Sequence, residues 1–463
     1  MAIYRIPELK LPLDHSDFDI RQRVARELNV PPEAVLSWRV ERKSVDARDR
    51  SAIKIVYGVA ATLAGTSNAR RHPALAFPPA PLGGSYLFPE PRRAPAGRPV
   101  IVGAGPAGLF CALLLAERGL RPLVLERGGD VDSRIASIDL FWKTGRLDPD
   151  SNMQFGEGGA GTFSDGKLNT TVNDPSGRNG KVLAEFVAAG APEEIGFLSK
   201  PHIGTDLLVG VVRNLRRKIE ALGGEVRFRA KVTSLLVEGG RTVGVVVDGS
   251  ESIPAGAVVL AVGHSARDVF ERLARDGVPM EPKAFAIGVR IEHPQEMISR
   301  NQFGASWRHP ALPVADYKLT ARASDGRGVY SFCMCPGGQV VNASSEEGGV
   351  ACNGMSDFAR GGRNANSAIV VQVGPEDFDA VPAGLPPVLA GVEFQRRWER
   401  LAFAAGGGDF ALPVQTLADF RDRRASTALG GVKPDIRGPW RPADITGALP
   451  PGVVSGILDG LGA

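Results

Sequence analysis

Hydrophobic and polar positions alternate with two different periods over the first seventy residues. In FDIRQRVARELNV, Ile20, Val24 and Leu28 recur at intervals of four, which places them on one face of a helix. The flanking segments YRIPELKLPL, VLSWRVERKSV and SAIKIVYGVAATL read as strands. The pattern predicts a small α+β domain of ferredoxin-like type over residues 1–71.

The second half of this predicted domain is basic. It carries six cations, at Arg39, Arg42, Lys43, Arg48, Arg50 and Lys54. Such a run is usually a solvated sheet face, and the alternative is a surface that binds nucleic acid or a protein partner. The net charge of +4 over 463 residues does not require nucleic acid, and we expect none as a partner.

Proline dominates the next segment, HPALAFPPAPLGGSYLFPEPRRAPAGRP, from His72 to Pro99. Proline fixes φ and has no N–H to donate to a sheet, so the segment cannot continue the preceding strands. We therefore predict a semi-rigid extended linker over residues 72–98.

After the linker, PVIVGAGPAGLFCALLLAERGLRPLVLERGG predicts a strand, a glycine turn, a helix and a second strand. Gly103, Gly105 and Gly108 are spaced as G-x-G-x-x-G. The first glycine permits the turn, the second lets backbone approach a pyrophosphate, and the third lets the helix pack on the strand. Pro106 and Ala107 open the helix, whose N-terminal N–H groups would face the phosphates. The motif predicts dinucleotide binding.

Glu126, followed by Arg127, ends the second predicted strand. A carboxylate there accepts hydrogen bonds from ribose hydroxyls and repels a 2′-phosphate, which fits NAD or FAD but not NADP. Downstream lie a helix, short hairpin-linked strands that include Val232, and a fully buried strand, AVVLAVG, that ends in Gly263. This order favours FAD and predicts an FAD-binding domain over residues 99–284.

A second glycine-rich stretch, NMQFGEGGAGTFSDGKLN, spans residues 152–169. Glycine lets backbone approach a flat ring closely, so Gly158 and Gly159 are predicted to lie against the flavin. Ser164 and Thr162 would bond the ring's heteroatoms, and Lys167 would stabilise negative charge on it. The alternative is a mobile surface loop.

Two further segments carry candidate chemistry. In FAIGVRIEHPQ, Arg290 and Glu292 share one strand face, so Arg290 would either clamp a substrate carboxylate or form an ordinary ion pair. In YSFCMCPGG, Cys333 and Cys335 are expected on one strand face, as buried structural cysteines rather than a redox pair. Catalytic residues stay unassigned, with Arg290, Cys335 and Lys167 as candidates.

Composition bounds the class of protein. The hydrophobic fraction of 43% and the charged fraction of 23% are those of a globular chain, and 463 residues suit several domains. Neither a signal-peptide pattern nor an apolar run of about 20 residues is present, so we expect a cytoplasmic protein. Four cysteines are too few for a disulfide framework, and no metal site is expected.

The long motifs together resemble a widespread, mostly uncharacterised bacterial family of FAD-dependent dehydrogenases. The resemblance rests on VIVGAGPAGLFCALLLAERG, NMQFGEGGAGTFSDGKLNT, KPHIGTD, AVGHSARD, FAIGVRIEHPQ, SFCMCPGG and the N-terminal ERKSVDARDRSAIKIVY. It implies an α/β protein with a Rossmann-like domain that holds FAD non-covalently. It also implies a mixed α/β substrate domain over residues 285–463. The family's closing segment, a strand and helix beside the flavin, has no counterpart here, which indicates a truncated chain or a lost element.

Three functions follow from these observations. The first is a dehydrogenase that transfers hydride from a small-molecule substrate through FAD. The second is a flavin-dependent monooxygenase. The third is a non-enzymatic flavin- or RNA-associated protein that uses the basic N-terminal domain. One dinucleotide motif leaves NAD(P)H as a transient reductant or a redox partner as the electron carrier.

Overall fold

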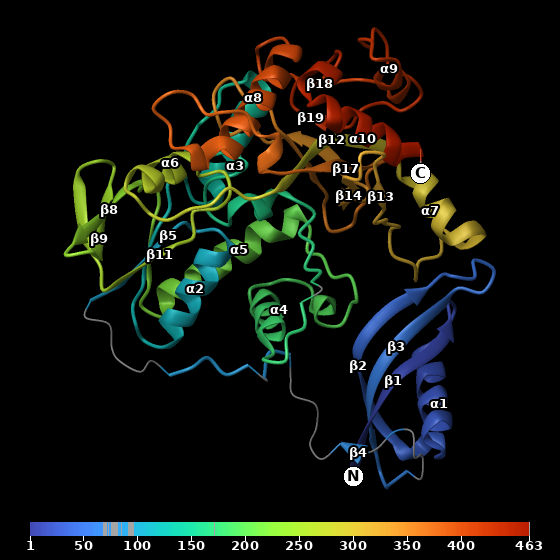
Figure 1. Ribbon diagram of the computed structural model, residues 1–463. Coiled ribbons are helices and arrows are strands. Elements are labelled where there is room, and N and C mark those ends of the chain that lie inside the picture. Colours follow the sequence, from blue (N-terminus) through green and yellow to red (C-terminus); the bar gives the residue numbers. More distant parts are fainter. Residues whose placement is uncertain are drawn as a thin grey trace. The chain divides into compact units, whose positions relative to one another are not determined.

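The computed structural model describes residues 1–67, 72, 74–75, 82–84, 86–90, 97–170 and 172–462. The chain forms two compact units, each assembled from three segments (Figure 1). The first unit comprises Met1–Phe88, Lys167–Ile203 and Gln295–Asp316. The second comprises Pro89–Gly166, Gly204–Pro294 and Tyr317–Ala463. The boundaries at residues 71, 98 and 284 stay predictions, and most of the predicted linker lies outside the described residues.

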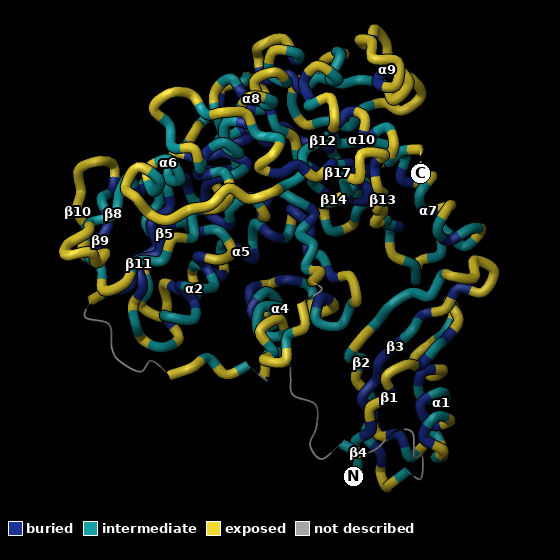
Figure 2. The backbone as a smooth tube through the Cα atoms, viewed as in Figure 1, coloured by how far each residue is buried: buried dark blue, intermediate teal, exposed yellow. Residues whose placement is uncertain are grey.

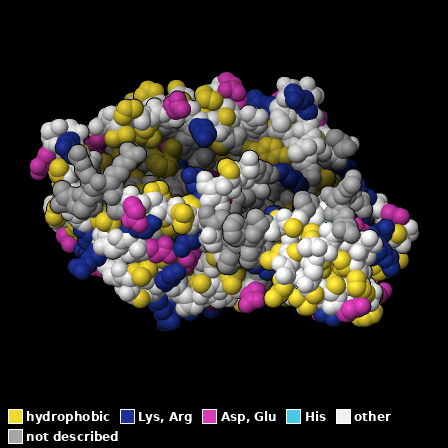
Figure 3. All heavy atoms as spheres, turned by 90° about the horizontal axis from the view of Figure 1, so that it is seen from below, with side chains coloured by type: hydrophobic (Ala, Val, Ile, Leu, Met, Phe, Trp, Pro, Cys, Tyr) yellow, Lys and Arg dark blue, Asp and Glu magenta, His cyan; other side chains and the backbone are white. Residues whose placement is uncertain are grey.

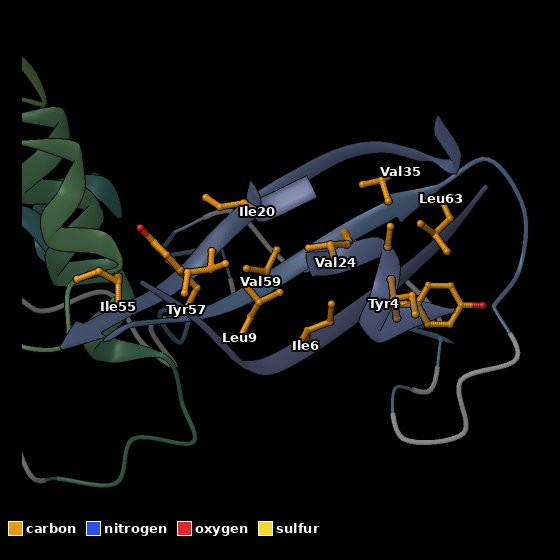
Figure 4. Packing of buried hydrophobic residues seen from close by; sticks show 14 residues of the cluster. Tyr4, Ile6, Leu9, Ile20, Val24, Val35, Ile55, Tyr57, Val59 and Leu63 are labelled. Carbon is orange, nitrogen blue, oxygen red and sulfur yellow. The ribbon is translucent and has the colours of Figure 1, made fainter. Parts of the chain in front are cut away.

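A four-stranded antiparallel sheet with one covering helix forms the start of the first unit. Its elements are β1 (Ala2–Pro12), α1 (Asp17–Leu28), β2 (Val35–Asp46), β3 (Lys54–Leu63) and β4 (Ala74–Leu75), in the sheet order β2-β3-β1-β4. Ile20, Val24 and Leu28 of α1 are buried in the core shown in Figure 4, which confirms the predicted helix face. The strand order is that of a ferredoxin-like sheet, but residues 68–71 are not described, so the ferredoxin-like assignment stays a prediction.

A 3₁₀ helix at Pro32–Ala34 joins α1 to β2. The other two segments of the first unit contain the helices α4 (Arg178–Ala188) and α7 (Gln295–Phe303) and the 3₁₀ helices at Glu193–Gly196 and Gly304–Ser306. The exposed edge of β2 is paired, because the N–H of Lys43 donates to the carbonyl of Phe197 at 2.7 Å. The N–H of Ser199 returns a bond to the carbonyl of Lys43 at 2.9 Å.

Of the six residues of the predicted basic stretch, Arg39 and Arg48 are paired with acids. Arg48 lies 2.6 Å from Asp46, and Arg39 lies 3.4 Å from Glu41. On the face shown in Figure 3, Lys and Arg side chains are interspersed with Asp and Glu side chains. The pairing of Arg39 and Arg48 is that of a solvated sheet face, and the alternative of a binding surface stays a prediction.

The second unit begins with a Rossmann-like layer. Four parallel strands lie in the order β11-β5-β6-β7: β11 (Ala257–Leu260), β5 (Pro99–Val102), β6 (Leu123–Leu125) and β7 (Glu225–Arg227). Strand β5 is followed by helix α2 (Pro106–Glu117), and β6 is followed by α3 (Val131–Thr144). A third helix, α5 (Thr205–Ala221), comes after the second glycine stretch. Strands β5 and β6 are buried throughout, as Figure 2 shows for the centre of this unit.

The predicted meander between α5 and the last parallel strand is present. It comprises β8 (Val232–Glu238), β9 (Arg241–Val247) and β10 (Glu251–Pro254), all antiparallel. The prediction that AVVLAVG is fully buried is wrong. Strand β11 lies at the edge of the parallel sheet, and Leu260 at its end is 40% exposed.

The rest of the second unit is built on an antiparallel sheet in the order β12-β17-β14-β13: β12 (Phe285–Pro294), β17 (Asn364–Val373), β14 (Gly328–Cys335) and β13 (Thr320–Arg322). The helices α8 (Ala390–Ala405) and α10 (Pro451–Gly462) contribute Phe394, Val453 and Ile457 to the core on one face of this sheet. Shorter elements are α6 (Arg267–Arg275), β15 (Gln339–Asn342), β16 (Cys352–Met355), β18 (Leu412–Val414), α9 (Leu417–Asp422), β19 (Ile436–Arg437), β20 (Trp440–Pro442) and the 3₁₀ helices at Pro375–Asp377, Pro387–Leu389 and Thr446–Ala448.

Strand β14 does not keep the regular alternation predicted for its cysteines. The register with β17 shifts between Phe332 and Cys335, and Cys333 has a φ of 45°. A bulge of this kind breaks the two-residue period. Met334 and Cys335 are therefore both buried, and the expectation that Cys333 and Cys335 share a strand face is wrong. No helix among the described residues is long and apolar enough to cross a membrane.

Candidate flavin-binding site

A cleft of about 380 Å³ opens at the carboxyl ends of the parallel strands in the second unit. Ligands of open α/β sheets bind at this edge. Segments from five parts of the chain line it, and they include Gly103, Gly105, Pro106, Ala107, Glu126, Arg127, Gln154, Gly159, Gly161, Val232, Gly263 and His264.

Each of the three positions in the first motif requires glycine for a different structural reason. Gly103 has a φ of 105°, and a Cβ there would lie 2.4 Å from the carbonyl oxygen of Ala261. A Cβ on Gly108 would lie 1.9 Å from the carbonyl oxygen of Gly103, so the close contact of helix and strand requires glycine. Gly105 differs, because its Cβ would face the cleft, with the Cα of Gly159 as its nearest neighbour at 3.8 Å.

Helix α2 starts at this point with its N-terminus uncapped. Gly105 is the N-cap, Pro106 is the first helical residue, and no side chain accepts a hydrogen bond from the first turn. Free N–H groups at a helix N-terminus favour an anion such as a pyrophosphate. The first glycine turn and the uncapped N-terminus of α2 therefore form one wall of the cleft.

The Glu126 carboxylate is 4% exposed and holds three segments together. Its Oε2 accepts the N–H of Ala104 at 2.7 Å, and its Oε1 accepts those of Gly128 and Gly156, both at 2.9 Å. A carboxylate offers about four lone-pair directions, so one stays for a ribose hydroxyl. The sequence predicted the contact of Glu126 with a ribose, but it did not predict the three backbone hydrogen bonds that Glu126 accepts.

Arg127 forms the rim of the cleft. Its Nη2 donates to both carboxylate oxygens of Asp268, at 2.9 and 3.0 Å, and its guanidinium lies 4.4 Å from the ring centroid of Phe155. Lys231 lies 3.0 Å from Asp150 and 3.1 Å from Asp268. The rim is thus an ordered ion-pair cluster beside Val232.

The second glycine stretch meets the first at this cleft. A Cβ on Gly159 would lie 3.0 Å from the Cα of Gly105, so the two loops approach through glycine on both sides. Gly161 has no atom within 4 Å of its Cβ direction, and it lines the cleft. Gly158 does not line the cleft, since its Cβ would meet the Thr162 hydroxyl at 2.0 Å and Val212 at 3.0 Å.

Two side chains predicted to contact the flavin are directed away from the cleft. Thr162 belongs to the 3₁₀ turn Gly159–Phe163, which turns it inward, and it is 1% exposed. Ser164 donates to the carbonyl of Gly161 at 2.7 Å, within its own loop. The burial of Thr162 and the hydrogen bond of Ser164 within its own loop do not agree with the predicted contacts of these two side chains with the flavin. Lys167 belongs to the first unit, where its backbone bridges that of His202, and its contact with the flavin stays a prediction.

A fully buried arginine, which the sequence analysis missed, organises the second glycine stretch. From α3, the guanidinium of Arg134 donates to the carbonyls of Asn152 (2.8 Å), Met153 (2.9 Å), Glu157 (2.8 Å) and Gly159 (2.8 Å). Burial lowers its pKa, while the charges of Glu126 and Glu157 raise it. The signal was present in the sequence, because Arg134 lies on the same helix face as Val131, Ile138 and Phe141.

Two further acids, within this loop, hold it in place. Glu157 is fully buried, accepts the N–H of Val131 at 2.7 Å, and pairs with Arg216 of α5 at 2.7 Å. Asp165 is fully buried and pairs with Arg360. The alternative of a mobile surface loop does not agree with these contacts.

Two of the three candidate catalytic residues, Arg290 and Cys335, lie on the antiparallel sheet, whereas Lys167 belongs to the second glycine stretch. Arg290 of β12 does not pair with Glu292, whose Oε1 instead accepts the N–H of Asp435 at 2.8 Å and the amide of Asn364 at 3.1 Å. Cys335 is fully buried, and no disulfide links the four cysteines, all of which lie among the described residues. No cluster of metal-ligating side chains is found in the part of the chain that the structure describes.

The cleft fits FAD on its own geometry. A Cβ at Gly105 or Gly161 would project into it, the uncapped α2 terminus faces anions, and Glu126 keeps one acceptor direction. These features define a Rossmann-type nucleotide site with a second backbone wall. Of the residues above, Gly105, Glu126, Arg127, Gly159 and Gly161 would hold the cofactor.

Family models and a curated relative agree with this class. Residues 284–463 match the model "FAD-dependent protein, C-terminal domain-like", residues 209–351 match "FAD dependent oxidoreductase", and residues 101–155 match "NAD(P)-binding Rossmann-like domain". Residues 3–62 match a domain of unknown function. An uncharacterised protein of Clostridium beijerinckii is 46% identical over 473 residues, which cover 100% of this chain and 85% of that protein.

The chain belongs to a family of FAD-dependent oxidoreductases, most of them uncharacterised, and FAD is its cofactor.

The solved structures that resemble this chain are more distant. FqzB is 17% identical with a TM-score of 0.31, over 61% of this chain and 55% of that one. A GidA-related protein from Thermus thermophilus is 20% identical with a TM-score of 0.24, over 43% and 73%. CtdE in complex with FAD is 17% identical with a TM-score of 0.29, over 62% and 61%. The chain thus spans about half the length of FqzB, and the family assignment rests on the curated relative and the family models.

Proposed function

We propose that this oxidoreductase is a dehydrogenase, which takes hydride from a small-molecule substrate onto FAD bound in the cleft. The observation that carries the proposal is the opposed pair of glycine backbones at Gly105 and Gly159, with Gly161 open beside them. FAD supplies the two-electron chemistry, and the chain supplies binding and orientation.

Each wall of the cleft has a separate task in this proposal. The first glycine turn and the α2 terminus bind the pyrophosphate, and Glu126 accepts a ribose hydroxyl with its remaining lone pair. Arg127 and Val232 border the adenosine half. The loop that Arg134 holds rigid lies along the cofactor's other half, where it excludes water and fixes the ring's position.

The fate of the electrons tests the proposal. Purified holoprotein is reduced anaerobically with dithionite and mixed either with oxygen or with the dye dichlorophenolindophenol. A dehydrogenase is expected to pass its electrons to the dye much faster than to oxygen. Rapid reoxidation by oxygen, with hydroxylation of an added substrate, would replace the proposal with a monooxygenase.

A control keeps the measurement specific to the bound flavin. The same experiment with an equal concentration of free FAD gives the background rate for each acceptor. Retained RNA that leaves the protein as salt is raised would instead support a nucleic-acid function for the basic N-terminal strands.

A further inference from the structure

Arg290 holds a positive charge with no acid to neutralise it. Its Nη1 donates to the Asn366 side-chain oxygen at 2.5 Å and to the carbonyl of Cys333 at 3.2 Å. Its Nη2 donates to the Asn353 side-chain oxygen at 3.3 Å. The three oxygen acceptors are neutral, Nη1 also contacts Cys335 Sγ at 4.0 Å, and Arg290 forms no ion pair with any carboxylate among the described residues.

The guanidinium also keeps unused donors. Arginine has five N–H groups, and the three bonds above leave two of them, on Nε and Nη2, without a partner in the described part of the chain. Nε and Nη2 form one edge of the planar group, which matches the two oxygens of a carboxylate. Gly354 packs closely against the guanidinium, since a Cβ there would lie 2.3 Å from Nη1.

A second donor beside it is also without a partner. Asn366 is fully buried, its side-chain oxygen is committed to Arg290, and its Nδ2 has no hydrogen-bond partner. An unpaired buried amide costs about 1–3 kcal/mol. A half-buried cation and a buried free N–H side by side are complementary to an anion.

An apolar row extends from Arg290 across the same sheet face. Arg290 of β12 is opposite Ala368 of β17, which is opposite Phe332 of β14, and Phe332 is 63% exposed. Strands lie about 4.8 Å apart, so the row is roughly 10 Å long. An exposed aromatic ring at this distance from a free fork suits the apolar part of an elongated acid.

We propose that Arg290, with Asn366 and Asn353, binds the carboxylate of the substrate, and that Ala368 and Phe332 contact its apolar part. Calling the ligand a substrate rests on the dehydrogenase function proposed above, whereas the binding site itself does not. Arg290 is a binding and specificity residue here, because its charge selects acids over their neutral analogues.

Isothermal titration calorimetry of the holoprotein tests the site. The probes are 4-phenylbutyrate, which has a carboxylate and a ring at its two ends, and its neutral amide. We expect the acid to bind wild-type protein and the amide to bind at least tenfold more weakly. Arg290→Gln should lower the affinity for the acid at least tenfold, and Arg290→Lys should lower it by less. Phe332→Ala should lower the same affinity severalfold.

The control is Arg322→Gln, which removes the same charge from an exposed position on β13, at the opposite edge of the sheet. It should leave the affinity within twofold. Acid and amide that bind equally, no acid binding, or unchanged affinity in folded Arg290→Gln would each overturn the proposal. So would sulfate that competes as strongly as the acid, since it would show a general anion site.

Stability does not decide the outcome. If Arg290→Gln does not fold, Arg290→Lys replaces it in the titration, because lysine keeps the charge but lacks the two parallel N–H groups. The comparison of acid with amide on wild-type protein needs no variant. Acid binding that depends on Arg290, in a protein that passes no hydride, would overturn the dehydrogenase function and leave the site standing.

Discussion

Replacing Glu126 with glutamine should destabilise the FAD-free protein as well as weaken FAD binding. The buried carboxylate accepts N–H groups from Ala104, Gly128 and Gly156. The glutamine oxygen can keep the pair at Gly128 and Gly156, but its NH₂ then faces the N–H of Ala104. One buried donor left without an acceptor costs about 1–3 kcal/mol.

Alanine at this position should do more damage. It leaves all three N–H groups unpaired, which amounts to about 3–9 kcal/mol if the costs add. The whole stability of a folded protein is about 5–15 kcal/mol. We therefore expect Glu126→Gln to fold with a lowered Tm and Glu126→Ala to fold poorly or not at all.

Urea unfolding of FAD-free protein measures this effect separately from cofactor binding. Glu281→Gln, at an exposed glutamate, is the matched control and should be neutral. FAD titrations on the folded variants then report the ribose contact. FAD-free Glu126→Gln as stable as the wild type, with only its FAD affinity reduced, would refute the role of Glu126 in joining the three segments.

Three further changes have defined outcomes. Gly161→Val should cut bound flavin at least tenfold. The control Gly447→Val, at an equally open and exposed glycine of another 3₁₀ turn, should leave bound flavin unchanged. Equal flavin content in the two variants at equal Tm would mean that Gly161 does not face the cofactor. Arg134→Lys should lower stability by at least about 1–3 kcal/mol in chemical denaturation, because three donors cannot serve four buried carbonyls, and the surface change Arg213→Lys should cost far less. Burial alone would raise the pKa of Glu346, but hydrogen bonds and charge from Arg396 and Arg267 lower it below 4.5. Its stabilisation is therefore full above pH 4.5 and lost as the pH falls, so Glu346→Gln should flatten the acid side of a plot of unfolding free energy against pH.

Local periodicity and local turn chemistry were readable from the sequence. The face of α1, the strands around it and the G-x-G-x-x-G turn each depend on residues within a few positions of one another. Gly103 and Gly108 are required by contacts inside one strand–turn–helix unit, which is why a short motif predicts them. The same holds for the order of helix, meander and returning strand.

Long-range partners were not readable. Arg134 looks like a surface charge in any pattern that treats arginine as polar, although its four acceptors lie about twenty residues further along the chain. Thr162 and Ser164 have the right chemistry for a flavin edge, but the 3₁₀ turn directs one inward and the other onto its own loop. The bulge at Cys333 likewise has no signature in the alternation of YSFCMCPGG.

Contacts within the chain shape the second glycine stretch. Arg134, Glu157 with Arg216, and Asp165 with Arg360 hold it in place. A cofactor that enters a surface already in place loses little free energy to ordering the protein, so more of its contact energy appears as affinity. Apoprotein stripped of FAD should recover it in a single bimolecular step whose rate rises linearly with FAD concentration, and the loop's amide hydrogens should exchange slowly before and after.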